Sequence, residues 1–268
     1  MIRLVITDVD GTLVRTDKSL APSTIAAVGR LRDAGIPLGI VSARPPFGLK
    51  AIVDTLSLHG LLAGFNGGVV TKPDGTVVER RLLPPPAAQQ ALALFAKYNV
   101  SAWFFTETEW LTQDPNGPRV LLERHTINTI ERVVSDFTPY QHECGKLVGV
   151  TDDEPLLGHI ETELQTMLGA TANAKRSQPY YLDVTHLEAN KGNAVRTLAG
   201  QFGLALSEVA VLGDQANDVP MFKVAGTSIC MGNGPPDVQA QASLVTGRND
   251  QDGWAHAIDT FILPRAAA

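Results

Sequence analysis

The chain has 268 residues, of which 44% are hydrophobic and 19% charged, so it can form one or two ordinary globular cores. A net charge of −6 and the lack of a Lys/Arg block exclude a typical nucleic-acid surface. No apolar run reaches the roughly 18 residues of a membrane span, and the first residues lack a signal-peptide pattern. Two cysteines are too few for a disulfide framework. We therefore expect a cytoplasmic protein that binds neither nucleic acid nor membrane.

The first third of the chain alternates strand and helix patterns. Apolar runs predict strands at residues 1–7, 36–41 and 62–65, and helical spacing predicts helices at 23–34 and 46–58. The turn sequence of residues 72–75 separates two further short runs and predicts a hairpin. Strands that alternate with helices in this way predict a parallel sheet with helices on both faces.

The composition changes at the three prolines of residues 84–86. Beyond them, the patterns predict helices at 87–98, near 127–137 and at 154–168, and strands at 102–105, 146–150, 171–174 and 180–184. This mixture predicts a separate α+β unit over residues 83–185, inserted into a core formed by residues 1–82 and 186–268.

The α/β alternation resumes at residue 190. We predict helices at 191–202 and 253–262, a short helix that contains Pro220, and strands at 209–212, 227–231 and 244–245. The expected fold class is therefore α/β, a Rossmann-like, doubly wound parallel-sheet core with an inserted α+β domain.

Polar clusters follow four of the predicted parallel strands. They are Asp8 with Asp10, Ser42 with Arg44, Asp214 with Asn217 and Asp218, and Gly232 with Asn233. The carboxyl ends of parallel strands share one edge of the sheet, so these side chains should meet, with Lys191 at the start of a neighbouring helix. Acids, a hydroxyl, an amide and a lysine together are typical of phosphoryl transfer, which needs a metal and donors for phosphate oxygens.

The sequence resembles the haloacid dehalogenase superfamily, specifically its Cof-type phosphatases with a large cap inserted between the second and third motifs. The resemblance rests on five segments in order: DVDGTLV at residues 8–14, VSAR at 41–44, NKGNA at 190–194, GDQANDVPMF at 213–222 and CMGNGPPDVQAQASLV at 230–245, with NDQDGW at 249–254. It implies a Mg²⁺-dependent phosphatase that acts on a small phosphorylated metabolite, with sugar phosphates first. The cap would close over the site and select the leaving group.

The resemblance also implies roles for the two acids after the first strand. Asp8 would be the nucleophile that forms an aspartyl-phosphate, with an ordinary pKa near 4. Asp10 would protonate the leaving oxygen and then deprotonate water, so we expect its pKa to be raised. Mg²⁺ would bind Asp8, the backbone carbonyl of Asp10, and Asp214, with Asp218 as direct or indirect support.

The remaining roles concern the phosphate, and each has a structural alternative. Ser42, Lys191 and Asn217 would hold the phosphate, whereas Arg44 would either touch the leaving group or form an ordinary ion pair. Ser42 could instead cap a turn, and Asn217 and Asp218 could cap the next helix. The most economical interpretation of Asn233 is a turn residue.

Two other functions remain open at this point. A phosphomannomutase-like enzyme would use the same nucleophile but return the phosphoryl group to a sugar. A receiver-like binding module would be phosphorylated without turnover, although Asp10 and the large insertion argue against it. The substrate and the oligomeric state do not follow from the sequence.

Overall fold

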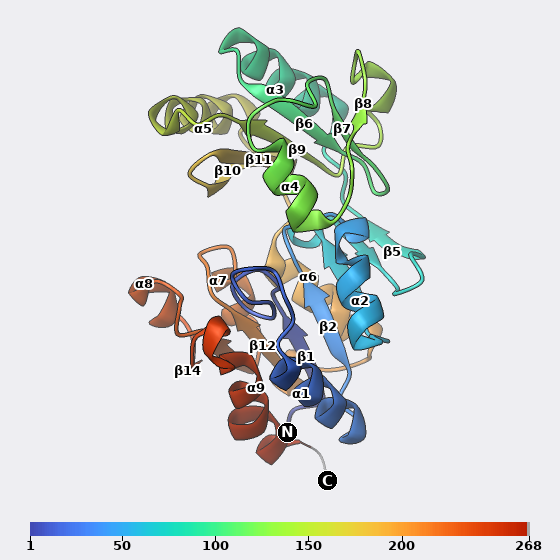
Figure 1. The fold of residues 1–268 in the computed structure, drawn as a ribbon, viewed down its shortest axis with the longest axis vertical. Coiled ribbons are helices and arrows are strands. Elements are labelled where there is room, and N and C mark those ends of the chain that lie inside the picture. The colour runs from blue at the N-terminus through green and yellow to red at the C-terminus, as the bar shows by residue number, and fades with distance from the viewer. Residues whose placement is uncertain (267–268) are drawn as a thin grey trace.

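The computed structural model describes residues 1–266, which form two sheets, one above the other in Figure 1. The lower, eight-stranded sheet has the order β14-β13-β12-β1-β2-β3-β4-β5. Its strands are β1 (Leu4–Thr7), β2 (Leu38–Val41), β3 (Leu62–Gly64), β4 (Val69–Thr71), β5 (Val77–Arg80), β12 (Val209–Gly213), β13 (Thr227–Cys230) and β14 (Leu244–Val245). All neighbours from β14 to β3 pair in parallel, whereas β4 and β5 form an antiparallel edge hairpin.

Helices cover both faces of this sheet, as the sequence predicts. One face packs on α1 (Pro22–Asp33), α2 (Lys50–Leu56) and α9 (Gly253–Ala257), and the other on α6 (Lys191–Gln201), α7 (Val219–Phe222) and α8 (Pro236–Gln239). Successive strand residues alternate between the two cores: Val5 lies in the first, and Leu4 and Ile6 lie in the second. The doubly wound α/β core is thus confirmed.

The second sheet has six strands in the order β10-β11-β9-β6-β7-β8. They are β6 (Ser101–Phe105), β7 (Trp110–Thr112), β8 (Arg132–Val133), β9 (Lys146–Val150), β10 (Ala172–Gln178) and β11 (Tyr181–His186). The helices α3 (Pro85–Lys97) and α5 (Glu154–Leu168) cover the face turned away from the first sheet, and α4 (Val120–Ile127) lies on the opposite side (Figure 1).

One predicted helix of this unit is wrong. The helix expected near 127–137 does not form. The helix α4 spans Val120–Ile127 instead, and it ends because Asn128 adopts the left-handed conformation at φ 50°. The chain then forms β8 instead of a helix, and the Asp136 side chain accepts a hydrogen bond from the backbone N–H of Thr138 in a local turn. The strand β7 (Trp110–Thr112) had no prediction.

The two sheets are joined by an apolar contact and by hydrogen bonds. Phe65, after β3, packs its ring so closely on Gly145 that a Cβ there would lie 2.3 Å from the ring. The backbone N–H of Leu83 donates to the carbonyl of Cys144 at 2.7 Å. The six-stranded sheet is therefore held directly over the carboxyl edge of the core. Within residues 1–266 no helix is both long and apolar enough to cross a bilayer.

Candidate active site

Adjacent parallel strands bring the first two acids of the site together. The register aligns Thr7 of β1 with Leu212 of β12, so Asp8 and Asp214 both follow the carboxyl ends of neighbouring strands. Asp8, Asp214 and Asp218 are buried, and one carboxylate oxygen of each lies within 4.8 Å of the others. Lys191, the first residue of α6, donates its Nζ to Asp8 Oδ1 at 2.6 Å and to Asp218 Oδ1 at 2.5 Å.

The charges in this cluster do not balance. Burial is the main cause that raises the pKa of Asp8 to about 8, and Asp218 and Asp214 raise it further, whereas Lys191 lowers it. Burial also raises the pKa of Asp214 to about 6, with a further contribution from Asp218. The ordinary pKa that we expected for Asp8 is therefore wrong for this arrangement of protein groups alone.

This excess of negative charge allows a test of whether the residues suit Mg²⁺. Mg²⁺ prefers hard carboxylate oxygens and retains water molecules in its shell. Three converging buried carboxylates face one lysine, so a further cation would lower the electrostatic cost of ionising Asp8 and Asp214. The donor set fits a divalent cation of this kind.

Asp218 already has a protein partner for each carboxylate oxygen. Its Oδ2 accepts hydrogen bonds from the backbone N–H groups of Asp214 and Gln215 at 2.7 and 2.8 Å, and its Oδ1 accepts from Lys191. The side chain makes no capping hydrogen bond to α7. Its observed contacts hold the loop after β12 and aim the lysine, which favours support of the site over direct binding of a metal.

Asp10 lies in a different electrostatic environment. Arg44 donates Nε and one terminal nitrogen to the two carboxylate oxygens of Asp10, both at 2.7 Å, and Lys18 donates Nζ at 2.8 Å. Although burial opposes the shift, these two cations lower the pKa of Asp10 to about 2. The raised pKa expected for Asp10 is wrong, because the cationic pair stabilises its charged form.

Three residues that the sequence analysis did not assign to the site surround Asp214. Thr12 donates to Asp214 Oδ1 at 3.1 Å, and Asn233 donates to Asp214 Oδ2 at 3.2 Å and to the carbonyl of Gly11 at 2.9 Å. Gly11 has φ +79°, and a Cβ there would lie 2.4 Å from Asp214 Oδ2. Asn233 therefore joins two loops of the site and does more than form a turn.

The phosphate-binding candidates Ser42 and Asn217 lie at the same edge of the sheet. Ser42 is buried after β2 and accepts the backbone N–H of Arg44 at 3.1 Å, which leaves its own hydroxyl hydrogen available. Asn217 donates its side-chain amide to Asn66 Oδ1 at 3.3 Å. The fold thus brings all eight predicted site residues to this edge. It adds Lys18, whose place in the loop after β1 had no sequence signal, and Thr12, which the DGT triplet of residues 10–12 could have indicated.

Comparison with known proteins agrees with this fold and site. The profile of the haloacid dehalogenase-like hydrolases matches residues 5–258. The chain is 27% identical over 256 residues to a putative phosphatase of Haemophilus influenzae, covering 95% of this chain and 96% of that protein. It is 28% identical over 242 residues to the HMP-PP phosphatase of Citrobacter koseri, covering 90% and 88%. A solved haloacid dehalogenase-like hydrolase from Bacteroides thetaiotaomicron has a TM-score of 0.90 at 27% identity, covering 97% and 99%.

The parallel α/β core and the phosphatase relatives define the class of protein, a phosphoric monoester hydrolase. The chain belongs to the haloacid dehalogenase-like hydrolase family, whose profile spans most of its length. The resemblance stated from the sequence motifs and the predicted enzyme class are both confirmed.

Proposed function

We propose that this enzyme is a Mg²⁺-dependent phosphatase that hydrolyses a small phosphorylated metabolite through a phosphorylated Asp8. The observation that carries the proposal is the arrangement of Asp8, buried beside Asp214 and in contact with Lys191. Asp8, Asp214 and the backbone carbonyl of Asp10 would hold the metal, with Asp218 in support. Mg²⁺, when bound, would neutralise charge on the phosphate and on Asp8.

The residues of the chain supply the chemical steps. An oxygen of Asp8 attacks phosphorus as the bond to the leaving oxygen breaks, and Asp10 gives that oxygen a proton. Water then attacks the phosphorylated Asp8, Asp10 takes its proton, and the bond between Asp8 and phosphorus breaks. Lys191, Ser42 and Asn217 would hold the phosphate oxygens.

Asp10 must lose its ion pairs with Arg44 and Lys18 before it can act as the acid. In the arrangement seen here Arg44 and Lys18 keep it ionised, which suits the later step in which it accepts a proton from water. An incoming phosphate competes for the same two cations, because it carries more negative charge than one carboxylate. We propose that this competition raises the pKa of Asp10, so that it takes up a proton from water before it gives that proton to the leaving oxygen.

The substrate would lie between the two sheets, with residues 83–185 as a cap on a core of residues 1–82 and 186–268. Placement of the cap over the Asp8 edge supports a role in excluding water and selecting the leaving group. Sugar phosphates are the first class to test. The HMP-PP phosphatase relatives make HMP-PP the next compound to test.

The first experiment measures inorganic phosphate released from a panel of phosphorylated metabolites, with and without Mg²⁺. We expect multiple turnovers with Mg²⁺ and almost none after chelation with EDTA, restored when Mg²⁺ is added back. Isomerisation of a hexose 1-phosphate without free phosphate, or a single turnover, would contradict the proposal. Rates that are unaffected by chelation would contradict the metal assignment alone.

A further inference from the structure

The face of the six-stranded sheet that is turned toward the core carries a few buried charged groups beside its apolar residues, such as Trp103 and Phe105. Alternation along the strands puts Leu147 and Leu182 into the core under α3 and α5, and leaves Lys146 and Asp183 on the other face. Both of these charged side chains are only 8% exposed. We call Glu123, Lys146, Tyr181 and Asp183 the inner polar cluster.

Asp183 is the unusual member of the inner polar cluster. Within residues 1–266 neither of its carboxylate oxygens has a hydrogen-bond partner, and the Lys146 Nζ stands 3.5 Å from the nearer one. Lys146 instead donates to the carbonyl of Ala43 at 3.2 Å. Glu123 is also buried, and its one contact in the cluster is a long one, 3.5 Å from the Tyr181 hydroxyl. Buried carboxylates normally have donors, so Asp183 lacks hydrogen bonds that the described residues do not supply, and Glu123 has only this long one.

The inner polar cluster lies at the mouth of the active site. Ala43, which accepts the hydrogen bond of Lys146, stands between Ser42 and Arg44 at the end of β2. The charges of Asp10 and Arg44 both act on the pKa of Glu123, which burial raises, so that this carboxyl is within electrostatic reach of them. A leaving group attached to a phosphate at Asp8 would extend past Arg44 toward these carboxylates.

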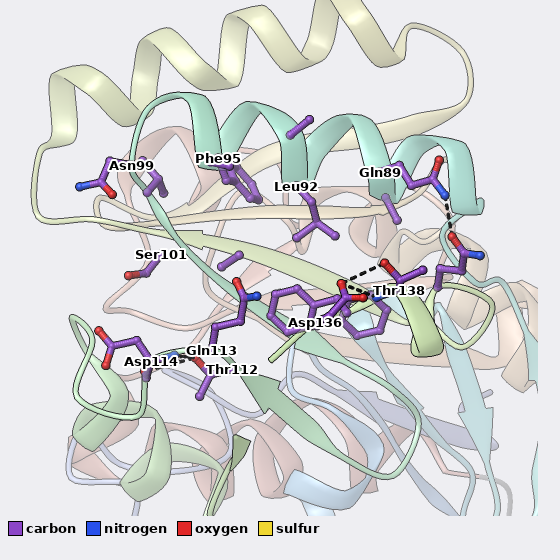
Figure 2. A pocket seen from close by; sticks show the side chains of 18 residues that line it. Gln89, Leu92, Phe95, Asn99, Ser101, Thr112, Gln113, Asp114, Asp136 and Thr138 are labelled. Atoms are coloured by element: carbon purple, nitrogen blue, oxygen red, sulfur yellow. Dashed lines mark hydrogen bonds between the residues drawn. The ribbon is translucent and has the colours of Figure 1, made fainter. Parts of the chain in front are cut away.

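A second hollow, also within residues 83–185, differs from the inner polar cluster in the hydrogen bonding of its polar side chains. Figure 2 shows a groove of about 570 Å³ between α3, β6, β7 and residues 136–141, on the side away from the core. Two pairs of its polar side chains are hydrogen-bonded to each other: Gln89 donates to Gln141 at 2.6 Å, and Thr138 donates to Asp136 at 2.9 Å. The acid Asp136 of this groove therefore has donors from the protein, unlike Asp183.

We propose that Asp183 and Glu123 accept hydrogen bonds from hydroxyl or amino groups of the leaving group, and so select phosphate esters of neutral polyols and amino sugars. The same carboxylates would repel leaving groups that bear a carboxylate or a second phosphate. Lys146 holds the cluster against the core through Ala43. This inference rests on the proposed phosphatase function and specifies its substrate class.

The test compares kcat/KM for glucose 6-phosphate, glucosamine 6-phosphate and 6-phosphogluconate, which differ at the leaving group. The wild-type enzyme should prefer the first two. In Asp183→Asn and Glu123→Gln, kcat/KM for the preferred esters should fall about 10- to 100-fold, the effect of losing a hydrogen bond to a charged group. Turnover of 6-phosphogluconate should fall less or rise. A larger loss for the amino sugar than for glucose identifies attraction of the ammonium, and equal losses identify hydroxyl binding.

Asp152→Asn is the matched control, because Asp152 is an exposed acid of the same unit that pairs with Arg119. Its ratio of kcat/KM for glucose 6-phosphate to kcat/KM for 6-phosphogluconate, the preference ratio, should equal that of the wild type. If folded Asp183→Asn and Glu123→Gln enzymes keep the wild-type ratio while they turn over substrate, this inference is wrong and the phosphatase function stands. If no protein releases phosphate from any ester, including p-nitrophenyl phosphate, the proposed function fails first.

Discussion

The two sides of the candidate active site differ in how completely their carboxylates are hydrogen-bonded. On the core side, the buried carboxylates of Asp8 and Asp218 and the half-buried carboxylate of Asp10 all receive hydrogen bonds from lysine, arginine or backbone donors. On the side of the six-stranded sheet, no group in the described part of the chain donates a hydrogen bond to Asp183. Fully paired polar groups hold a fixed geometry, whereas unpaired buried groups are costly unless something else completes them.

This difference matches what each side would contact under the proposed function. A phosphate group and a metal have constant shape and charge, so the groups that meet them can be fixed before binding. The leaving group varies among phosphate esters, and donors that belong to the substrate can pair Asp183 only when that substrate is present. The core side would thus set the reaction and the other side the choice of substrate.

The largest effect should come from the core side. Asp8→Asn should lower kcat by about 10³-fold or more, because an amide is a poor nucleophile and a weaker ligand for a cation. Steady-state release of phosphate measures this change, and circular dichroism and thermal unfolding check that the variant folds. Activity close to wild type would mean that Asp8 is not the attacking group.

A change of backbone geometry at the same edge should have the next largest effect. Gly11→Ala adds a Cβ that would lie 2.4 Å from Asp214 Oδ2, at a residue with φ +79°. The displacement of Asp214 should lower kcat about 100-fold, since catalytic groups tolerate little misplacement. Gly75→Ala is the control, because this glycine also has positive φ but has open space around it. If the two variants are equally active, crowding of Asp214 does not matter.

Two double substitutions, one on each side of the site, test this difference in pairing through the free energy of unfolding. K191M/D218L removes a lysine and an acid that also accepts two backbone N–H groups, so it should reduce the free energy of unfolding by about 2–4 kcal/mol. K146M/D183L removes a poorly paired couple and should be neutral or stabilising by about 1–4 kcal/mol. Urea unfolding measures both. Equal losses for the two double variants would contradict the proposed difference between the sides.

The core and its site were predictable because local patterns determined them. Each of β1, β2 and β12 has a clear apolar run that ends in polar residues, and parallel pairing then brings Asp8, Ser42 and Asp214 to one edge. The pKa of Asp10 was not predictable, because it depends on Arg44 and Lys18, which reach Asp10 only in three dimensions.

The inner polar cluster could not be predicted from the sequence for a similar reason. Lys146 and Asp183 share a face through the antiparallel register of β9 and β11, which no turn or motif between them specifies. Glu123 comes from α4, whose position the predicted helix at 127–137 missed. The inner polar cluster therefore became visible only in the fold.

The smallest expected effect concerns Ser42 and decides whether its hydroxyl binds phosphate or only supports a turn. Ser42→Ala removes the acceptor of the Arg44 N–H, which should cost about 1 kcal/mol of stability in either case. If the hydroxyl also donates to phosphate, the inhibition constant of inorganic phosphate should rise about tenfold. Ser228→Ala, which removes another buried hydroxyl bonded to Ser243, should lower stability comparably and leave that constant unchanged. Unchanged inhibition in Ser42→Ala would make Ser42 a turn residue that positions Arg44 and would leave Lys191 as the main phosphate contact.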